Sequence, residues 1–145
     1  MFFAFDAEES GLLGSTAWMK KPTVNKESIV AMFNMDMIGH LADNKALLVG
    51  GVGTGSGFAE RVKKAAHIAG LDVAVDQDGQ GPSDHSRFYA GGIPVLSFFT
   101  QTHELYHMPG DDWEPAYAMG IALLNEQHQR RARALLRVGL AQAHR

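Results

Sequence analysis

Two adjacent glutamates, Glu8 and Glu9, stand between an apolar run at residues 1–5 and a glycine-rich turn at residues 10–15. An apolar run that ends in charged residues predicts a buried strand with a site at its carboxyl end, where open α/β sheets bind ligands. Neighbouring side chains on an extended chain point in opposite directions, so both carboxylates serve one site only if the backbone turns there. One could then bind a metal ion while the other carries a proton. The alternative is a helix N-terminus, where the helix dipole favours acidic residues.

Polar residues also follow apolar segments at three other places: Asp36, the sequence Ser83-Asp84-His85, and His107 in a long polar loop. Each has a structural alternative. Asp36 could be a hydrogen-bonded structural acid, Ser83 and Asp84 could cap a short helix, and His107 could be a solvated loop histidine. If it were buried without a partner, however, Asp36 would cost roughly several kcal/mol.

Taken together, these residues are suited to metal chemistry. The chain has no cysteine, so any metal ion must be held by His, Asp and Glu. Carboxylate and imidazole ligands suit zinc with an open coordination position, and a second carboxylate beside a ligand could deprotonate a zinc-bound water. The candidate ligands Glu9, Asp36 and His107 are far apart in sequence, and no His-Glu-x-x-His helix motif is present. A sheet must therefore bring them together.

The elements that would position these residues alternate along the chain. Apolar runs predict strands, and helical periodicity with breaker residues predicts helices. The expected strands are at residues 1–6, 28–37, 46–49, 71–75 and 93–99, and the expected helices are at residues 11–20, 56–69, 84–90 and 117–143. Alternation of this kind is typical of an α/β fold, with a mostly parallel or mixed central sheet flanked by helices.

Composition limits the classes of function. The 145 residues, of which 46% are hydrophobic, suffice for the core of one domain. The formal net charge is -3 and no basic patch is visible, so we expect no nucleic-acid partner. No apolar stretch approaches the roughly 18 residues that a membrane span needs.

Four segments, in this order, resemble the co-catalytic di-zinc aminopeptidases, a family that also contains glutamate carboxypeptidase II and the glutaminyl cyclases. They are Phe-Asp-Ala-Glu-Glu-Ser-Gly-Leu-Leu-Gly-Ser at 5–15, Asn-Met-Asp-Met-Ile-Gly at 34–39, Ser-Asp-His-Ser-Arg-Phe-Tyr-Ala-Gly-Gly-Ile-Pro-Val at 83–95 and Tyr-His-Met-Pro-Gly-Asp-Asp-Trp at 106–113. The resemblance implies a zinc-exopeptidase-like fold and a zinc-dependent aminopeptidase that removes N-terminal residues from peptides. It also implies that residues 1–145 are the C-terminal part of a single catalytic domain, without its N-terminal strands.

The resemblance implies a role for each matching residue. Glu8 would be the general base. Glu9 and His107 would ligate one zinc ion and Asp36 the other, two ions making a complete site. Asp84 and His85 would lie at the rim of the substrate pocket, and Tyr106 would lie close behind the metal ligands.

The sequence departs from the family at one point. The family's site also needs a His-x-Asp segment upstream of the two glutamates, and only seven residues, none of them His, precede Glu8. We therefore expect this chain alone to bind zinc weakly and to be inactive or nearly so. Two alternatives stay open, a non-catalytic fragment used for assembly and a glutaminyl cyclase-like acyltransferase. Exposed sheet edges would favour homo-oligomers. The compartment stays open, although such relatives are commonly exported.

Overall fold

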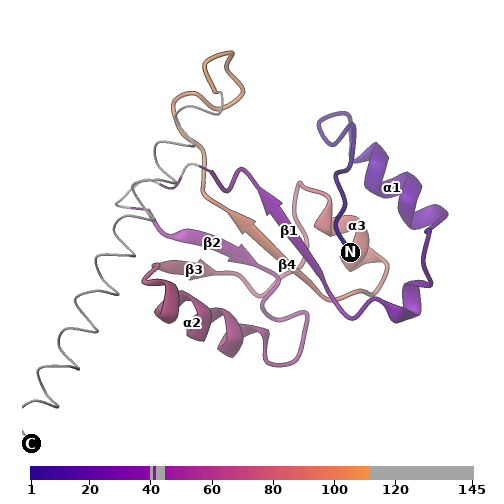
Figure 1. Cartoon of the computed structure of the whole chain (residues 1–145), viewed down its shortest axis with the longest axis horizontal. Coiled ribbons are helices and arrows are strands. Elements are labelled where there is room, and N and C mark those ends of the chain that lie inside the picture. Colours follow the sequence, from indigo (N-terminus) through magenta and orange to yellow (C-terminus); the bar gives the residue numbers. More distant parts are fainter. Residues whose placement is uncertain (40, 42–44, 112–145) are drawn as a thin grey trace, which may run out of the picture.

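The computed structural model describes residues 1–39, 41 and 45–111. These residues form an α/β fold (Figure 1). In chain order the elements are α1 (Leu13–Lys20), the 3-10 helix η1 (Lys26–Ser28), β1 (Met32–Asp36), β2 (Leu47–Gly50), α2 (Phe58–Ala69), β3 (Val73–Val75), α3 (His85–Ala90) and β4 (Val95–Phe99). The predicted terminal helix at residues 117–143 lies outside the described residues. None of the helices in the described part combines the length and the apolar character needed to span a bilayer.

The four strands form one mixed sheet in the order β1-β4-β2-β3. β1 is parallel to β4 and β2 is parallel to β3, whereas β2 and β4 are antiparallel. The mixed form of the predicted sheet is therefore confirmed. Because β1 and β4 are parallel and Asp36 pairs with Phe99, their carboxyl ends meet at one edge of the sheet. This edge is where the sequence predicts the site.

Apolar clusters pack against both faces of the sheet. On the face covered by α2, the buried residues are Val49, Val52, Val62 and Leu96. On the face covered by α1 and α3, they are Phe88, Ile93 and Val95, with the half-buried Trp18 and Met19 of α1 packed against them. Figure 1 shows α2 on one side of the sheet and the pair α1 and α3 on the other. The sheet is thus held between two helical layers.

The predicted buried strand at residues 1–6 is wrong. This segment forms no strand, and Met1 and Phe2 are 78% and 96% exposed. Within the described residues it exchanges no backbone hydrogen bonds with a strand, since the sheet contains only β1, β4, β2 and β3. Its aromatic side chains pack on helices instead: the ring centroid of Phe5 lies 5.9 Å from that of Phe88, and that of Phe3 lies 4.8 Å from that of Trp18.

The turn after β2 is tied to the start of β4. Gly51 has a φ of +82°, and a Cβ atom at this position would clash with the carbonyl oxygen of Val95. The Thr54 hydroxyl oxygen accepts a hydrogen bond of 2.9 Å from the Val95 N–H, and it lies 2.8 Å from the carbonyl oxygens of Gly51 and Val95. Glycine is required here because the backbone is left-handed and closely packed.

Candidate active site

The backbone turns at the two glutamates. The carbonyl oxygen of Glu8 accepts hydrogen bonds from the N–H groups of Gly11 (3.0 Å) and Leu12 (2.8 Å), and Ala7 has a φ of 55°. This turn allows both carboxylates to serve one site. The alternative of a charged helix start does not hold, since α1 begins only at Leu13 and its first turn contains no acidic residue.

One cavity collects most of the predicted site residues. It has a volume of about 710 Å³, and its lining includes Glu8, Glu9, Asp36, His85, Tyr106 and His107. Asp84 lines a neighbouring cavity of about 780 Å³, which also reaches Glu8, Glu9 and Asp36. All seven predicted residues therefore gather at the carboxyl edge of β1, although they come from distant parts of the sequence.

Glu9 and His107 form a pair. His107 Nε2 lies 3.0 Å from Glu9 Oε1, and both side chains are largely exposed. The ring of Tyr106 stacks on that of His107 with centroids 4.0 Å apart. Two donors that share a tetrahedral zinc ion lie about 3.4 Å apart, given metal–ligand bonds of about 2.1 Å. The spacing of Glu9 and His107 is close to that value, so this pair fits two ligands of one zinc ion.

The number of donors is smaller than a metal centre needs. Among the described residues, no group of three His, Asp or Glu side chains comes close enough to hold a metal ion. Structural and catalytic zinc sites use at least three protein ligands. The donor chemistry of Glu9, Asp36 and His107 suits zinc, but these residues form only part of a centre.

Glu8 lies among other carboxylates, which affects its protonation. Burial raises the pKa of its carboxyl, and the neighbouring carboxylates of Glu9, Asp36 and Asp84 raise it further. A hydrogen bond with the Ser83 side chain acts in the opposite direction. A carboxyl with a raised pKa gives up and takes back protons closer to neutral pH, which is compatible with the general-base role that the sequence predicts for Glu8.

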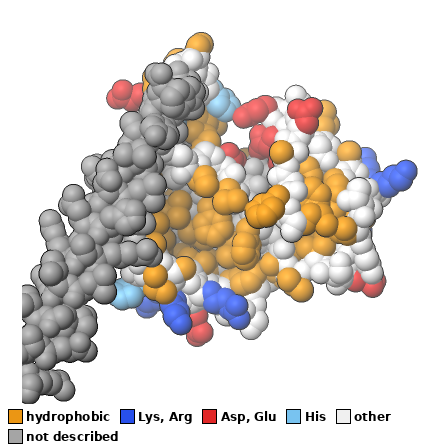
Figure 2. All heavy atoms as spheres, viewed as in Figure 1, with side chains coloured by type: hydrophobic (Ala, Val, Ile, Leu, Met, Phe, Trp, Pro, Cys, Tyr) orange, Lys and Arg blue, Asp and Glu red, His pale blue; other side chains and the backbone are white. Residues whose placement is uncertain are grey.

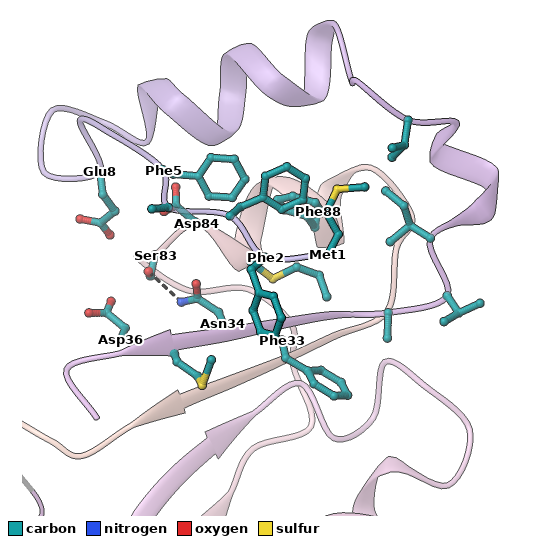
Figure 3. Close-up of a pocket in the computed structure, with 18 of the residues that line it drawn as sticks. Met1, Phe2, Phe5, Glu8, Phe33, Asn34, Asp36, Ser83, Asp84 and Phe88 are labelled. Carbon is teal, nitrogen blue, oxygen red and sulfur yellow. Dashed lines mark hydrogen bonds between the residues drawn. The ribbon is translucent and has the colours of Figure 1, made fainter. Parts of the chain in front are cut away.

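A buried hydrogen bond orients the Ser83 hydroxyl that contacts Glu8. Asn34 Nδ2 donates to Ser83 Oγ over 2.9 Å, and both side chains are buried. Because the Ser83 oxygen accepts from Asn34, its own proton is free to be donated to Glu8. Figure 3 shows Ser83 between Glu8 and Asn34, with Asp36 beside them. The sequence analysis missed Asn34, although its position two residues before Asp36 places both on the same face of β1.

Asp84 and His85 lie at the start of α3, where they line the two cavities of the site. Asp84 occupies the N-cap position but makes no side-chain capping bond, so the helix-cap alternative does not account for it. It is 8% exposed, and within the described residues its Oδ1 atom has no hydrogen-bond partner. His85 is 4% exposed, and its Nδ1 atom has no partner in the part of the chain that the structure describes. Burial lowers the pKa of His85. The hydrogen bond with the Gln80 carbonyl and the charges of Asp36 and Asp84 act to raise this pKa, but the effect of burial is larger.

Left-handed backbone conformations concentrate at the site. Among non-glycine residues, Ala7, Met37 and His107 have φ angles of 55°, 50° and 57°. Ala7 precedes Glu8, Met37 follows Asp36, and His107 is itself a predicted ligand. The buried Thr100 hydroxyl donates to the Met37 carbonyl oxygen and so fixes the turn after β1. Strain of this kind is typical of functional sites, where the surrounding structure holds it in place.

Several known proteins are similar to this chain in sequence and fold. Residues 1–126 match the sequence model of peptidase family M28. Aminopeptidase YwaD of Bacillus subtilis (strain 168) is 33% identical over 130 residues, which cover 78% of this chain and 27% of the relative. The crystal structure of BSAP, a zinc aminopeptidase from Bacillus subtilis, matches with a TM-score of 0.59 and 28% identity, over 83% of this chain and 33% of that one.

An aminopeptidase from Aneurinibacillus sp. strain AM-1 matches with a TM-score of 0.53 and 28% identity, over 77% of this chain and 27% of its own. The chain thus spans about a third or less of the length of these relatives. The family match, by contrast, covers most of the 145 residues. The chain belongs to peptidase family M28.

Proposed function

We propose that this chain forms part of the active site of a zinc-dependent aminopeptidase, in which Glu8 is the general base. The observation that carries the proposal is the pair of Glu9 and His107 at 3.0 Å, which lines the same cavity as Glu8 and Asp36. Family membership and the zinc aminopeptidase structures that it resembles support the same reaction class.

Two zinc ions complete the proposed site. Glu9 and His107 would hold one ion and Asp36 would contribute to the other. When bound, zinc polarises the scissile carbonyl and lowers the pKa of the attacking water toward roughly 7. A further His-x-Asp segment, which the family resemblance requires, would supply the remaining ligands. Without it, residues 1–145 should bind zinc weakly.

Glu8 would take a proton from the attacking water and return it to the leaving amine. Its raised pKa suits a group that must bind a proton and release it again. General acid–base catalysis of this kind contributes roughly 10²–10⁴ in rate. The buried pair of Asn34 and Ser83 would hold the Glu8 carboxylate in one orientation.

Asp84, His85 and Tyr106 would contact the peptide substrate. Asp84 lines the cavity that also reaches Glu8, and its carboxylate would accept a hydrogen bond from a substrate N–H. Tyr106 lines the outer part of the cavity that also contains His107. His85, which is buried, would shape the wall.

The test is made in the complete enzyme that contains this chain. Glu8→Gln should lower kcat by about 10² or more while the zinc content of the protein, measured by atomic absorption, stays unchanged. His107→Ala should lower the zinc content as well as the activity, whereas His67→Ala, at an exposed position on α2, should change neither. Normal turnover in the Glu8→Gln enzyme would refute the assignment of the base.

The products separate the peptidase from an acyltransferase. A peptide with an N-terminal glutamine should release the free amino acid. Release of ammonia with formation of pyroglutamate would instead identify a glutaminyl cyclase.

A further inference from the structure

His107 is an exposed side chain. Its exposed fraction is 54% and that of its partner Glu9 is 75%, so packing does not hold either of them in place. Figure 1 shows the segment after β4 leaving the sheet as a loop. Figure 2 shows acidic and histidine side chains gathered at the upper edge of the visible face, above a mainly apolar surface. A metal ligand has to be held to within about 0.5 Å, so the position of His107 depends on the loop that carries it.

The base of this loop is tied to the segment that precedes β2. Gln101 Nε2 donates a hydrogen bond of 2.7 Å to the carbonyl oxygen of Ala46. Lys45 Nζ donates one of 3.0 Å to the carbonyl oxygen of Thr102. The two bonds cross in opposite directions between the same two segments. The loop therefore leaves the end of β4 from a fixed position.

Beyond its base the loop folds back in three successive tight turns. Each turn is closed by a backbone hydrogen bond, and the three bonds run from Tyr106 N–H to the His103 carbonyl (3.0 Å), from Met108 N–H to the Leu105 carbonyl (2.9 Å) and from Asp111 N–H to the Met108 carbonyl (3.0 Å). His107 lies inside the second turn, with a φ of 57°. A left-handed backbone is unfavourable for a residue with a Cβ atom, so other contacts have to hold this shape.

Side chains from the first and last turns meet across the loop. His103 Nε2 lies 3.6 Å from Asp111 Oδ2, and the two side chains are 12% and 32% exposed. A pair that is partly buried is screened less by solvent and salt than a fully exposed one. Leu105 and Gly110 also approach each other, since a Cβ atom at Gly110 would lie 3.6 Å from Leu105 Cδ2. These contacts close the loop on both sides of His107.

We propose that His103 and Asp111 are positioning residues, which hold this loop in the shape that presents His107 to Glu9. The pair joins the two ends of residues 103–111 and so restricts the backbone of the turns between them. Its effect on zinc rests on the proposed function, in which Glu9 and His107 bind one ion. Its effect on the loop does not, because the contact is made in the metal-free structure. Residues that orient a ligand change metal affinity or activity about 10–100-fold.

The first test measures zinc affinity in the complete enzyme that contains this chain, by titrating zinc into enzyme from which a chelator has removed the metal. His103→Phe and Asp111→Leu should each weaken zinc binding about tenfold or more. The double variant should bind no more weakly than either single variant, because both changes remove the same contact. Glu104→Leu is the matched control, since it makes a similar change at an exposed position of the same loop and should leave the affinity unchanged.

The second test needs no zinc. Amide hydrogen exchange in the metal-free enzyme follows the N–H groups of Tyr106 and Met108, which are hydrogen-bonded within the loop. Both amides should exchange about tenfold faster in Asp111→Leu than in the wild type, because the loop opens more often. They should keep their wild-type rates in Glu104→Leu.

Rescue by zinc distinguishes a positioning role from a catalytic one. Excess zinc should restore the activity of Asp111→Leu, whose ligands are all present, but not that of Glu8→Gln.

The outcomes also separate the two proposals. Faster exchange in Asp111→Leu, in an enzyme whose wild type binds no zinc, would support the positioning role and refute the proposed function. Unchanged exchange and zinc affinity in Asp111→Leu would overturn the positioning role and leave the proposed function intact. Additive losses of zinc affinity in the double variant would also overturn it, because His103 and Asp111 would then act separately.

Discussion

Glu8 is surrounded by like charges. Burial, followed by the carboxylates of Glu9, Asp36 and Asp84, raises the pKa of its carboxyl above the ordinary value of 4.5. Because the folded pKa exceeds the unfolded one, the folded chain binds this proton more tightly. The stabilising contribution of Glu8 is therefore complete below pH 4.5 and is lost as the pH rises through the folded pKa. At neutral pH the ionised Glu8 destabilises the fold.

Glu8→Gln should therefore stabilise the metal-free chain at pH 7, since an amide resembles the protonated carboxyl and does not repel Glu9. The gain should shrink toward zero at pH 4. Urea denaturation in the presence of a chelator, at both pH values, measures it. Glu60→Gln, at an exposed position on α2, is the matched control and should show no such dependence on pH. A Glu8→Gln effect of equal size at both pH values would contradict the electrostatic explanation.

His85 gives a prediction of the opposite sign. Burial lowers its pKa from the ordinary value of 6.5, although the Gln80 carbonyl, Asp36 and Asp84 all act to raise it. The unfolded chain then takes up a proton that the folded chain does not, so the fold should lose stability as the pH falls below 6.5. The slope of unfolding free energy against pH between 7 and 5 should become smaller in His85→Gln. It should keep its wild-type value in His67→Gln, whose histidine is exposed.

The sequence singles out side chains that could react more readily than those that hold them. Glu8, Glu9, Asp36 and His107 stand out because carboxylates and imidazole follow apolar runs there, and the structure brings all four to one cavity. Asn34 does not, since an amide inside a strand has no reactive character. Its partner Ser83 is 49 residues away in sequence, and only the parallel pairing of β1 with β4 and the position of α3 bring the two together.

At the scale of elements, the turn between β2 and α2 depends on Gly51. We expect Gly51→Ala to destabilise the fold by about 3 kcal/mol, from the left-handed backbone and from overpacking against the Val95 carbonyl. Gly92 is the matched control, because its φ of +80° is similar but a Cβ there would meet open space. Gly92→Ala should cost only about 1 kcal/mol. Equal losses in thermal unfolding would show that strain alone, and not the close approach of β4, decides the effect.

Periodicity predicted α1, α2 and α3 and most of the strands in the described residues, but not their ends. β4 begins at Val95 because Pro94 cannot donate a backbone hydrogen bond. β1 begins only at Met32, after the 3-10 helix that Asn25 caps by accepting a hydrogen bond from the Glu27 N–H. The segment at residues 1–6 failed for a different reason. A strand needs a neighbouring backbone as well as apolar side chains. This segment has the apolar side chains, but within the described residues no strand pairs with it.

At the scale of the whole molecule, the described residues have two separate apolar clusters on opposite faces of one sheet. The sheet order was not predictable from the sequence, because periodicity says which residues are buried and not which strands are neighbours. The cluster beneath α1 and α3 has a second role. It packs Phe5, Trp18 and Phe88 together, and Phe5 lies on the segment that leads into Glu8.

Phe88 therefore contributes both to the stability of the fold and to the position of the segment that leads into Glu8. It is 2% exposed, and its ring centroid lies 5.4 Å from that of Trp18 and 5.9 Å from that of Phe5. Phe88→Ala should cost about 3–5 kcal/mol, a large part of the roughly 5–15 kcal/mol that stabilises a typical domain. Phe2→Ala removes the same side chain from a position that is 96% exposed and should change stability by less than about 0.5 kcal/mol.

Urea denaturation of both variants measures these costs, and the intrinsic fluorescence of Trp18 reports the cluster directly when Trp113 is replaced by Phe. Loss of the Phe88 ring should expose Trp18 to water and shift its emission to the red even in the folded state. A small cost for Phe88→Ala with unchanged emission would mean that α1 is held by its backbone hydrogen bonds to Asp6 and Ala7. The orientation of Glu8 would then depend on the turn alone and not on the aromatic cluster.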